Sequence, residues 1–180
     1  MTKRKRRTTY GVEGVRKKVY PVVEEILTGT VLAIDPSCIS YSSVPGWALY
    51  KEGELHSSGT ISTISPALSL ERRIQLLGKY CREEFEEPDV LAIEHISMGR
   101  ASMVSTIKAV GAILGNFETE HVISISPLAW QAYIEKKIPL GEGSEYIKYK
   151  HYKEMHKSDE KDAQMIGLAI VEIAKETVDN

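Results

Sequence analysis

Two short, unbroken apolar runs constrain the fold of this chain more than any other feature. Residues 31–34 and residues 90–93 both read Val-Leu-Ala-Ile, and each run ends in an acid, Asp35 in the first and Glu94 in the second. A run of this length without polar alternation is typical of a central strand that is covered on both faces of a sheet. We therefore expect two neighbouring parallel strands with a carboxylate at the carboxyl end of each.

The remaining periodicity predicts three more strands and four helices. Strands are expected at residues 46–50, 55–62 and 122–125, and helices at residues 70–85, at 101–117, from Ser126-Pro127 onward, and at 158–177. The second of these helices should carry its apolar side on Val104, Ile107, Val110, Leu114 and Phe117. Three strands in succession, followed by alternating helices and strands, imply an α/β fold with a mixed five-stranded sheet and helices on both faces.

The chain places a basic arm in front of an acidic body. Residues 1–20 hold eight Lys or Arg and one acid, whereas the formal net charge of the whole chain is −2. With 180 residues and 42% apolar residues, we expect one domain at residues 30–180 behind a partly flexible arm at residues 1–29. The arm could neutralise DNA phosphates, act as a targeting tag, or only keep the chain soluble.

Composition excludes several classes of protein. No apolar run approaches the roughly 18 residues of a membrane-spanning helix, and no apolar stretch of about 7–15 residues follows the basic start as in a secretory signal. The two cysteines, Cys38 and Cys81, cannot form a disulfide framework or a four-ligand zinc site by themselves. We therefore expect a reduced, intracellular setting and no membrane partner.

Two further acids lie near the start of the last predicted helix. Asp159 and Asp162 are three residues apart, so they share a helix face, and that face continues into the apolar stripe that must point at the sheet. A buried carboxylate is costly without compensation. Because Asp35 and Glu94 end strands at the edge where open α/β sheets bind ligands, we expect the four acids to hold Mg²⁺, or Mn²⁺ in its place. The alternative is that Asp159 and Asp162 only complement the helix dipole.

Three segments resemble the motifs of RuvC-like Holliday junction resolvases, which belong to the RNase H-like superfamily. Residues 34–37 (Ile-Asp-Pro-Ser) with residues 46–48 (Gly-Trp-Ala) resemble the first motif, residues 92–95 (Ala-Ile-Glu-His) the second, and residues 159–163 (Asp-Glu-Lys-Asp-Ala) the terminal helix. The resemblance implies an RNase H-like fold and a homodimer that cuts two opposed strands of a four-way junction with Mg²⁺ or Mn²⁺. It also implies that the metal-binding, catalytic residues are Asp35, Glu94, Asp159 and Asp162.

The chain departs from the usual pattern of that family at three places. Ser37 stands where a glycine is usual, and Ile96-Ser97 follow the second motif where bacterial members often carry an aromatic residue. Where a lysine is often found early in the helix after the fifth strand, Trp130 stands nearest. We expect Trp130 and Trp47 to lie in the core.

Basic residues are the candidates for contacts with DNA, because backbone affinity comes from phosphate neutralisation. They form three groups: the arm, the segment beyond the second motif, and a basic, Tyr-rich stretch at residues 136–157. The tyrosines of this stretch could stack on unpaired bases or pack in the core. The residues expected to bind DNA are Lys3, Arg4, Lys5, Arg6 and Arg7 of the arm, Arg100 and Lys108 beyond the second motif, and Lys148 and Lys150.

The acids and the resemblance together predict a structure-selective endodeoxyribonuclease that resolves Holliday junctions and other branched DNA by two-metal hydrolysis. An alternative with the same fold is an RNase H-like nuclease that acts on RNA–DNA hybrids or flaps. A junction-binding protein that does not cut is an alternative from another class. An actin-like or sugar-kinase-like ATPase also has a first strand that ends in Asp, but this chain lacks Gly-rich phosphate loops.

Overall fold

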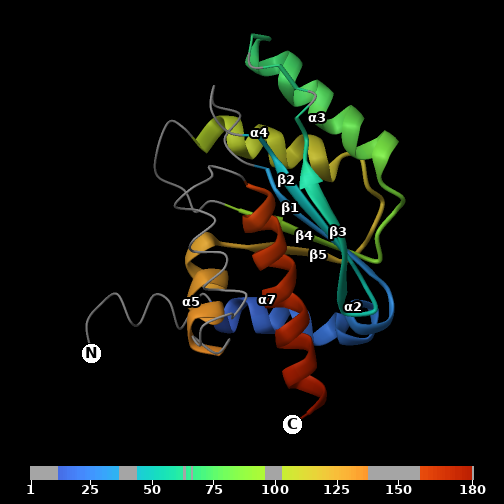
Figure 1. Ribbon diagram of the computed structural model, residues 1–180, viewed down its shortest axis with the longest axis vertical. Helices are drawn as coiled ribbons and strands as arrows, with labels where there is room; N and C mark the ends of the chain where they lie inside the picture. The colour runs from blue at the N-terminus through green and yellow to red at the C-terminus, as the bar shows by residue number, and fades with distance from the viewer. Residues whose placement is uncertain are drawn as a thin grey trace, which may run out of the picture.

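A mixed sheet of five strands forms the centre of the molecule (Figure 1). The computed structural model describes residues 12–36, 44–62, 64–65, 67–95, 103–137 and 159–179. The strands are β1 (Thr30–Asp35), β2 (Gly46–Lys51), β3 (Glu54–Thr60), β4 (Val90–Glu94) and β5 (Val122–Ile125), in the spatial order β3-β2-β1-β4-β5. The hairpin-linked strands β1, β2 and β3 are antiparallel neighbours, whereas β4 and β5 join β1 in parallel. This confirms the predicted mixed sheet.

The two identical apolar runs lie side by side at the centre of that sheet. β1 and β4 pair in parallel with Val31 opposite Val90 and Ile34 opposite Ile93, and all eight residues of the two runs are buried. Helices cover both faces, as an unbroken apolar run requires. The shared register brings the carboxyl ends of β1 and β4 to the same edge of the sheet.

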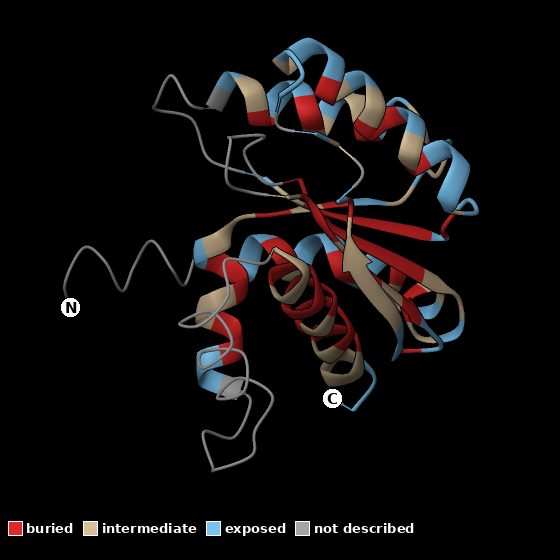
Figure 2. Ribbon diagram, turned by 45° about the horizontal axis from the view of Figure 1, so that its top comes forward, coloured by how far each residue is buried: buried red, intermediate tan, exposed pale blue. Residues whose placement is uncertain are grey.

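The helices form two layers, one on each face of the sheet (Figures 1 and 2). Helices α3 (Leu70–Glu84) and α4 (Met103–Leu114) pack on one face around Leu32 and Ile34 of β1. The other face carries α2 (Val23–Thr28), α5 (Pro127–Lys137) and α7 (Glu160–Val178), which pack around Val31 and Ala33. Alternate side chains of β1 therefore point to opposite layers, and buried residues line both sides of the sheet in Figure 2.

The expected apolar side of the helix over 101–117 is wrong in part. α4 buries Ala109 and Ile113, whereas Val104 is 56% and Ile107 is 53% exposed. Leu114 is also exposed, while Val110 and Phe117 pack at the margin of the core. Apolar residues occupy two faces of this helix, so its periodicity alone does not select the buried one. α4 therefore presents apolar side chains to the outside of the chain.

Part of the segment predicted as an N-terminal arm is helical. Residues 12–19 form a helix that continues through η1 (Tyr20–Val22) into α2. Val15, Val19, Val22 and Ile26 are buried in the same cluster as α7. The division of the chain at residue 29 stays a prediction, and Lys3 to Arg7 lie outside the described residues.

None of the helices in the described part of the chain combines the length and the apolar character that crossing a bilayer requires.

Asp89 joins the amino ends of the two central strands. Its Oδ2 accepts hydrogen bonds from the backbone N of Thr30 at 2.6 Å and from Thr30 Oγ1 at 2.8 Å. The backbone N of Asp89 in turn donates to Thr30 Oγ1 at 3.1 Å. The hydrogen bond from the backbone of Thr30, followed by the one from its side chain, lowers the pKa of the Asp89 carboxyl group below its ordinary value.

We expect Asp89→Ala to lower the free energy of unfolding by at most about 1 kcal/mol at pH 7, because the site is exposed and solvent weakens its hydrogen bonds. Because the pKa is lowered in the folded state, this stabilisation is complete above the unfolded pKa of about 4 and is lost as the pH falls through the folded-state pKa. Urea unfolding of both proteins between pH 7 and pH 3 measures the difference. A difference that stays constant over this range would contradict the assignment; Glu86→Ala, at an exposed acid, is the control.

Candidate metal centre

The first acid of the site, Asp35, is the last residue of β1. It follows Val31 and Ala33 in the alternation of the strand, so its side chain points toward the layer of α5 and α7. Asp35 is only 6% exposed. A carboxylate at this depth requires compensating hydrogen bonds or positive charge.

The amino-terminal turn of α7 supplies two more acids. Asp159 is the N-cap residue of the helix, but its side chain makes no capping hydrogen bond to the helix. Asp162, in the first turn, is buried at 9% exposure. Complementing the helix dipole does not require burial, so the dipole alone does not account for the position of Asp162.

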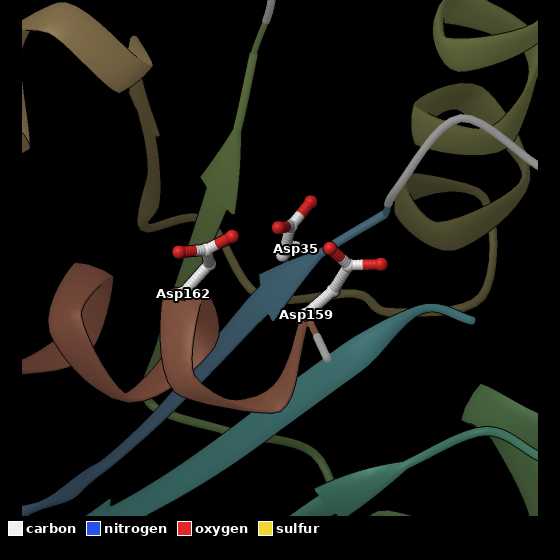
Figure 3. A group of neighbouring side chains, drawn as sticks. All are labelled: Asp35, Asp159 and Asp162. Carbon is white, nitrogen blue, oxygen red and sulfur yellow. The ribbon is translucent and has the colours of Figure 1, made fainter. Parts of the chain in front are cut away.

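The three carboxylates meet at the end of β1 (Figure 3). One oxygen each of Asp35, Asp159 and Asp162 lies within 4.8 Å of the other two. Asp35 and Asp162 are buried, while Asp159 is half-buried. Residues more than 120 positions apart in the sequence therefore form one acidic cluster.

Gly46 allows this approach. It is the first residue of β2 and pairs with Asp35, so it lies between the end of β1 and the start of α7. A Cβ atom at position 46 would overlap the backbone carbonyl group of Asp159. A second close approach follows along the helix, where a Cβ atom on Gly167 would overlap the ring of Tyr50. These two glycines allow α7 to lie directly on β2.

Hydrogen bonds hold the start of α7 against the sheet. Ser58 Oγ of β3 donates to Glu160 Oε1 at 2.6 Å and accepts from Gln164 Nε2 at 2.6 Å. Lys161 Nζ donates to Gln164 Oε1 at 2.6 Å, and the hydroxyl group of Tyr50 donates to the backbone oxygen of Gln164 at 2.6 Å. The α7 members of this network lie next to Asp159 and Asp162 in the sequence. The hydrogen bonds therefore fix the helix turn that carries both acids.

The fourth predicted acid, Glu94, has a different immediate partner. It ends β4 beside Asp35 and follows Val90 and Ala92 in the alternation of the strand, so it points to the same face of the sheet. Its Oε2 accepts a hydrogen bond from Trp130 Nε1 of α5 at 2.8 Å. The carboxylate of Glu94 is not a member of the three-residue group. The prediction that Trp130 lies in the core is confirmed, since it is 1% exposed, but its contact with Glu94 was not predicted.

Few of the residues predicted to bind DNA lie in the described part of the chain. Lys108 is exposed on α4. The remaining predicted residues, which lie outside the described residues, are Lys3, Arg4, Lys5, Arg6, Arg7, Arg100, Lys148 and Lys150. Their roles stay predictions.

The donor set of the acidic cluster fits a hard divalent cation. Asp35, Asp159 and Asp162 offer carboxylate oxygens, without a histidine or cysteine in the group. Oxygen-only sites of this kind favour Mg²⁺, Mn²⁺ or Ca²⁺ over zinc or copper. Two of the three carboxylates are buried, and a bound cation would compensate their charge.

We expect Gly46→Ala to impair both folding and cation binding. The added methyl group would displace the start of α7, which should lower the free energy of unfolding by about 1–3 kcal/mol, as overpacking typically does. Mn²⁺ affinity, measured by calorimetry on the folded fraction, should fall because Asp159 moves away from Asp35. Gly14→Ala is the matched control, since nothing lies within 4 Å of a Cβ atom there. Unchanged Mn²⁺ affinity in Gly46→Ala would contradict the role given to this contact.

Comparisons with solved structures find the same fold at low sequence identity. No protein-family model and no curated protein sequence match the chain. The structure of Thermus thermophilus RuvC in complex with a Holliday junction substrate matches with a TM-score of 0.56 and 16% identity, over 83% of this chain and 95% of that chain. A second Thermus thermophilus RuvC structure matches with a TM-score of 0.56 and 18% identity, over 83% and 96%.

A weaker match is the fowlpox virus Holliday junction resolvase, with a TM-score of 0.40 and 16% identity, over 79% of this chain and 98% of that chain. Identities this low establish a shared fold and no more. The element order, the mixed five-stranded sheet and the two Thermus thermophilus structures agree with the predicted fold class. The chain therefore has the α/β, RNase H-like fold of RuvC.

Proposed function

We propose that this chain is a metal-dependent endonuclease that hydrolyses phosphodiester bonds in branched DNA, with the four-way junction as its preferred substrate. The observation that carries the proposal is the convergence of Asp35, Asp159 and Asp162 within 4.8 Å at the carboxyl end of β1. The shared fold of RuvC, one of whose structures contains a Holliday junction substrate, supports the choice of substrate. Ligands of open α/β sheets bind at this same edge.

The proposed roles of the acids follow from their positions. Asp35 is fixed by the end of a central strand, and Asp159 and Asp162 are fixed by the first turn of α7, so three oxygens face a common point without further movement of the backbone. Mg²⁺ or Mn²⁺, when bound, would polarise the scissile phosphate and lower the pKa of a water molecule. Glu94, at the end of the neighbouring strand, is the proposed fourth acid of the same centre.

The proposed DNA contacts must overcome an acidic body. The chain has a formal net charge of −2 although residues 1–20 contain eight Lys or Arg and one acid, so the remainder is strongly acidic. Phosphate binding therefore requires local basic groups. We assign this role to the basic residues of the arm, to Arg100 and Lys108, and to Lys148 and Lys150.

Cutting two opposed strands of a junction requires two active sites, and we propose that a homodimer provides them. The exposed apolar side chains of α4, Val104, Ile107 and Leu114, support this proposal. An apolar helix face of this kind is commonly covered by another protein surface. Small residues on the same helix, among them Gly111, would allow a second helix to approach closely.

The nuclease activity is tested on a synthetic four-way junction with Mg²⁺. We expect Asp35→Asn or Asp162→Asn to lower the rate of cutting by at least about 100-fold, comparable to the loss of one preorganised charge-stabilising group, while junction binding persists. Asp179→Asn is the matched control, because it changes the same residue type at the other end of α7, about 25 Å from Asp162 at 1.5 Å per residue.

Comparison of substrates separates the proposal from its alternatives. Cutting of RNA–DNA hybrids or flaps in preference to four-way junctions would assign the chain to another RNase H-like activity. Tight junction binding without metal-dependent cutting would assign it to the non-cutting class. Cutting that survives either substitution would remove the role assigned to that acid.

The dimer is tested by light scattering after size-exclusion chromatography. We expect the full chain to have about twice the mass of one 20.1 kDa chain, and Ile107→Glu to shift it toward the monomer, because the charge would be buried in the proposed contact. Val178→Glu, which places the same charge at an exposed apolar residue of α7 in the other helix layer, is the control. A monomeric wild-type chain at high concentration would contradict the dimer.

A further inference from the structure

Trp130 lies in direct contact with the one predicted acid that is outside the three-residue group. Its Nε1 donates to Glu94 Oε2 at 2.8 Å, and its side chain is 1% exposed. We propose that Trp130 is a positioning residue, which holds the carboxylate of Glu94 in the orientation that completes the metal centre. This inference rests on the proposed function, because it gives Glu94 a place in that centre.

The backbone brings the two residues together. β4 and β5 pair in parallel up to Glu94 opposite Ile125, and the backbone N of His95 donates to the backbone oxygen of Ile125 at 2.9 Å. β5 then turns directly into α5 at Ser126, whose backbone oxygen accepts a hydrogen bond from the backbone N of Trp130 at 3.2 Å. The first turn of α5 is therefore fixed next to the end of β4.

The chemistry of the indole group limits what Trp130 can do. Indole Nε1 is a donor only, so it neither binds a cation nor accepts a proton. A buried indole N–H requires an acceptor, and a carboxylate provides a strong one. Trp130 can therefore orient the Glu94 carboxylate but cannot replace it.

Glu94 needs such orientation more than the three aspartates do. Glutamate has one more rotatable side-chain bond than aspartate, so its carboxylate can take more orientations. The Glu94 side chain also starts from β4, the strand next to the one that carries Asp35. Replacing a residue that hydrogen-bonds to a metal ligand and orients it typically lowers metal affinity by about 10- to 100-fold. The hydrogen bond from Trp130 fixes one oxygen of Glu94, so the direction of the whole carboxylate follows from it.

Trp130 also fills the core, so the experiment must separate packing from orientation. Trp130→Phe keeps an aromatic ring but removes the N–H donor. Trp47 is the only other tryptophan of the chain. It packs in the opposite layer, with its ring at a centroid distance of 5.1 Å from Phe85 in an edge-to-face contact. Trp47→Phe is therefore a matched control for the loss of an indole group.

The first measurement is the dissociation constant for Mn²⁺ by calorimetry. We expect Trp130→Phe to bind Mn²⁺ about 10-fold or more weakly than the wild type, and Trp47→Phe to bind it unchanged. The double variant with Glu94→Gln should bind no more weakly than Glu94→Gln alone, because both changes remove the same interaction. Wild-type affinity in Trp130→Phe, or losses that add independently, would overturn the proposal.

The second measurement leaves Trp130 in place, so it decides the question even if Trp130→Phe does not fold. In Trp47→Phe, all tryptophan fluorescence comes from position 130. Paramagnetic Mn²⁺ should quench this fluorescence over the concentration range in which calorimetry detects binding. Glu94→Gln in the same background should shift the midpoint of quenching to higher Mn²⁺ concentration. Binding without quenching, or quenching that is indifferent to Glu94→Gln, would overturn the proposal.

The outcomes distinguish this inference from the proposed function. A wild-type chain that binds Mn²⁺ and cuts junctions, together with a Trp130→Phe variant that does both equally well, would overturn the role of Trp130 alone. A wild-type chain that neither binds Mn²⁺ nor cuts would overturn the proposed function, and the positioning role with it.

Discussion

The approach of the first turn of α7 to the end of β1 is the contact on which the site depends. It brings together three carboxyl groups, two of them buried, and burying acidic groups side by side costs free energy. The rest of α7 must offset this cost. The helix buries Ala163, Ile166, Ala169 and Ile170 against the sheet, each without measurable exposure. The site is thus held by apolar packing further along the same helix.

Much of the fold could be predicted from the sequence, because the central strands are encoded by local pattern. The repeated run at residues 31–34 and 90–93 identified the two parallel neighbours and the edge at which their acids lie. The exposed side of α4 could not be predicted in this way. Both of its faces are apolar, and the buried one is selected by contact with α3, where Gly78 allows the backbone of Ala112 to come close. Periodicity marks an apolar helix face, but it does not tell which of two apolar faces a neighbouring helix covers.

The candidate site could also be predicted in large part from the sequence. The spacing of Asp159 and Asp162 and the strand end at Asp35 indicated that these acids converge, and the structure brings them together. The contact between Glu94 and Trp130 was missed, because it joins two elements through side-chain geometry alone. A signal did exist: a tryptophan expected in the core must place its N–H group on an acceptor, and Glu94 ends the neighbouring strand at the sheet edge where the helix with Trp130 begins.

Carboxylates lie in different surroundings at the two ends of the central strands. At the amino end, Asp89 accepts two hydrogen bonds from Thr30, so its charge is compensated within the fold. At the carboxyl end, Asp35 and Asp162 are buried beside another carboxylate. The hydrogen bonds from Thr30 stabilise the first arrangement as long as Asp89 is ionised, and a cation that binds the folded state alone would add stability to the second. The same pair of strands therefore provides a structural carboxylate at one end and a candidate binding site at the other.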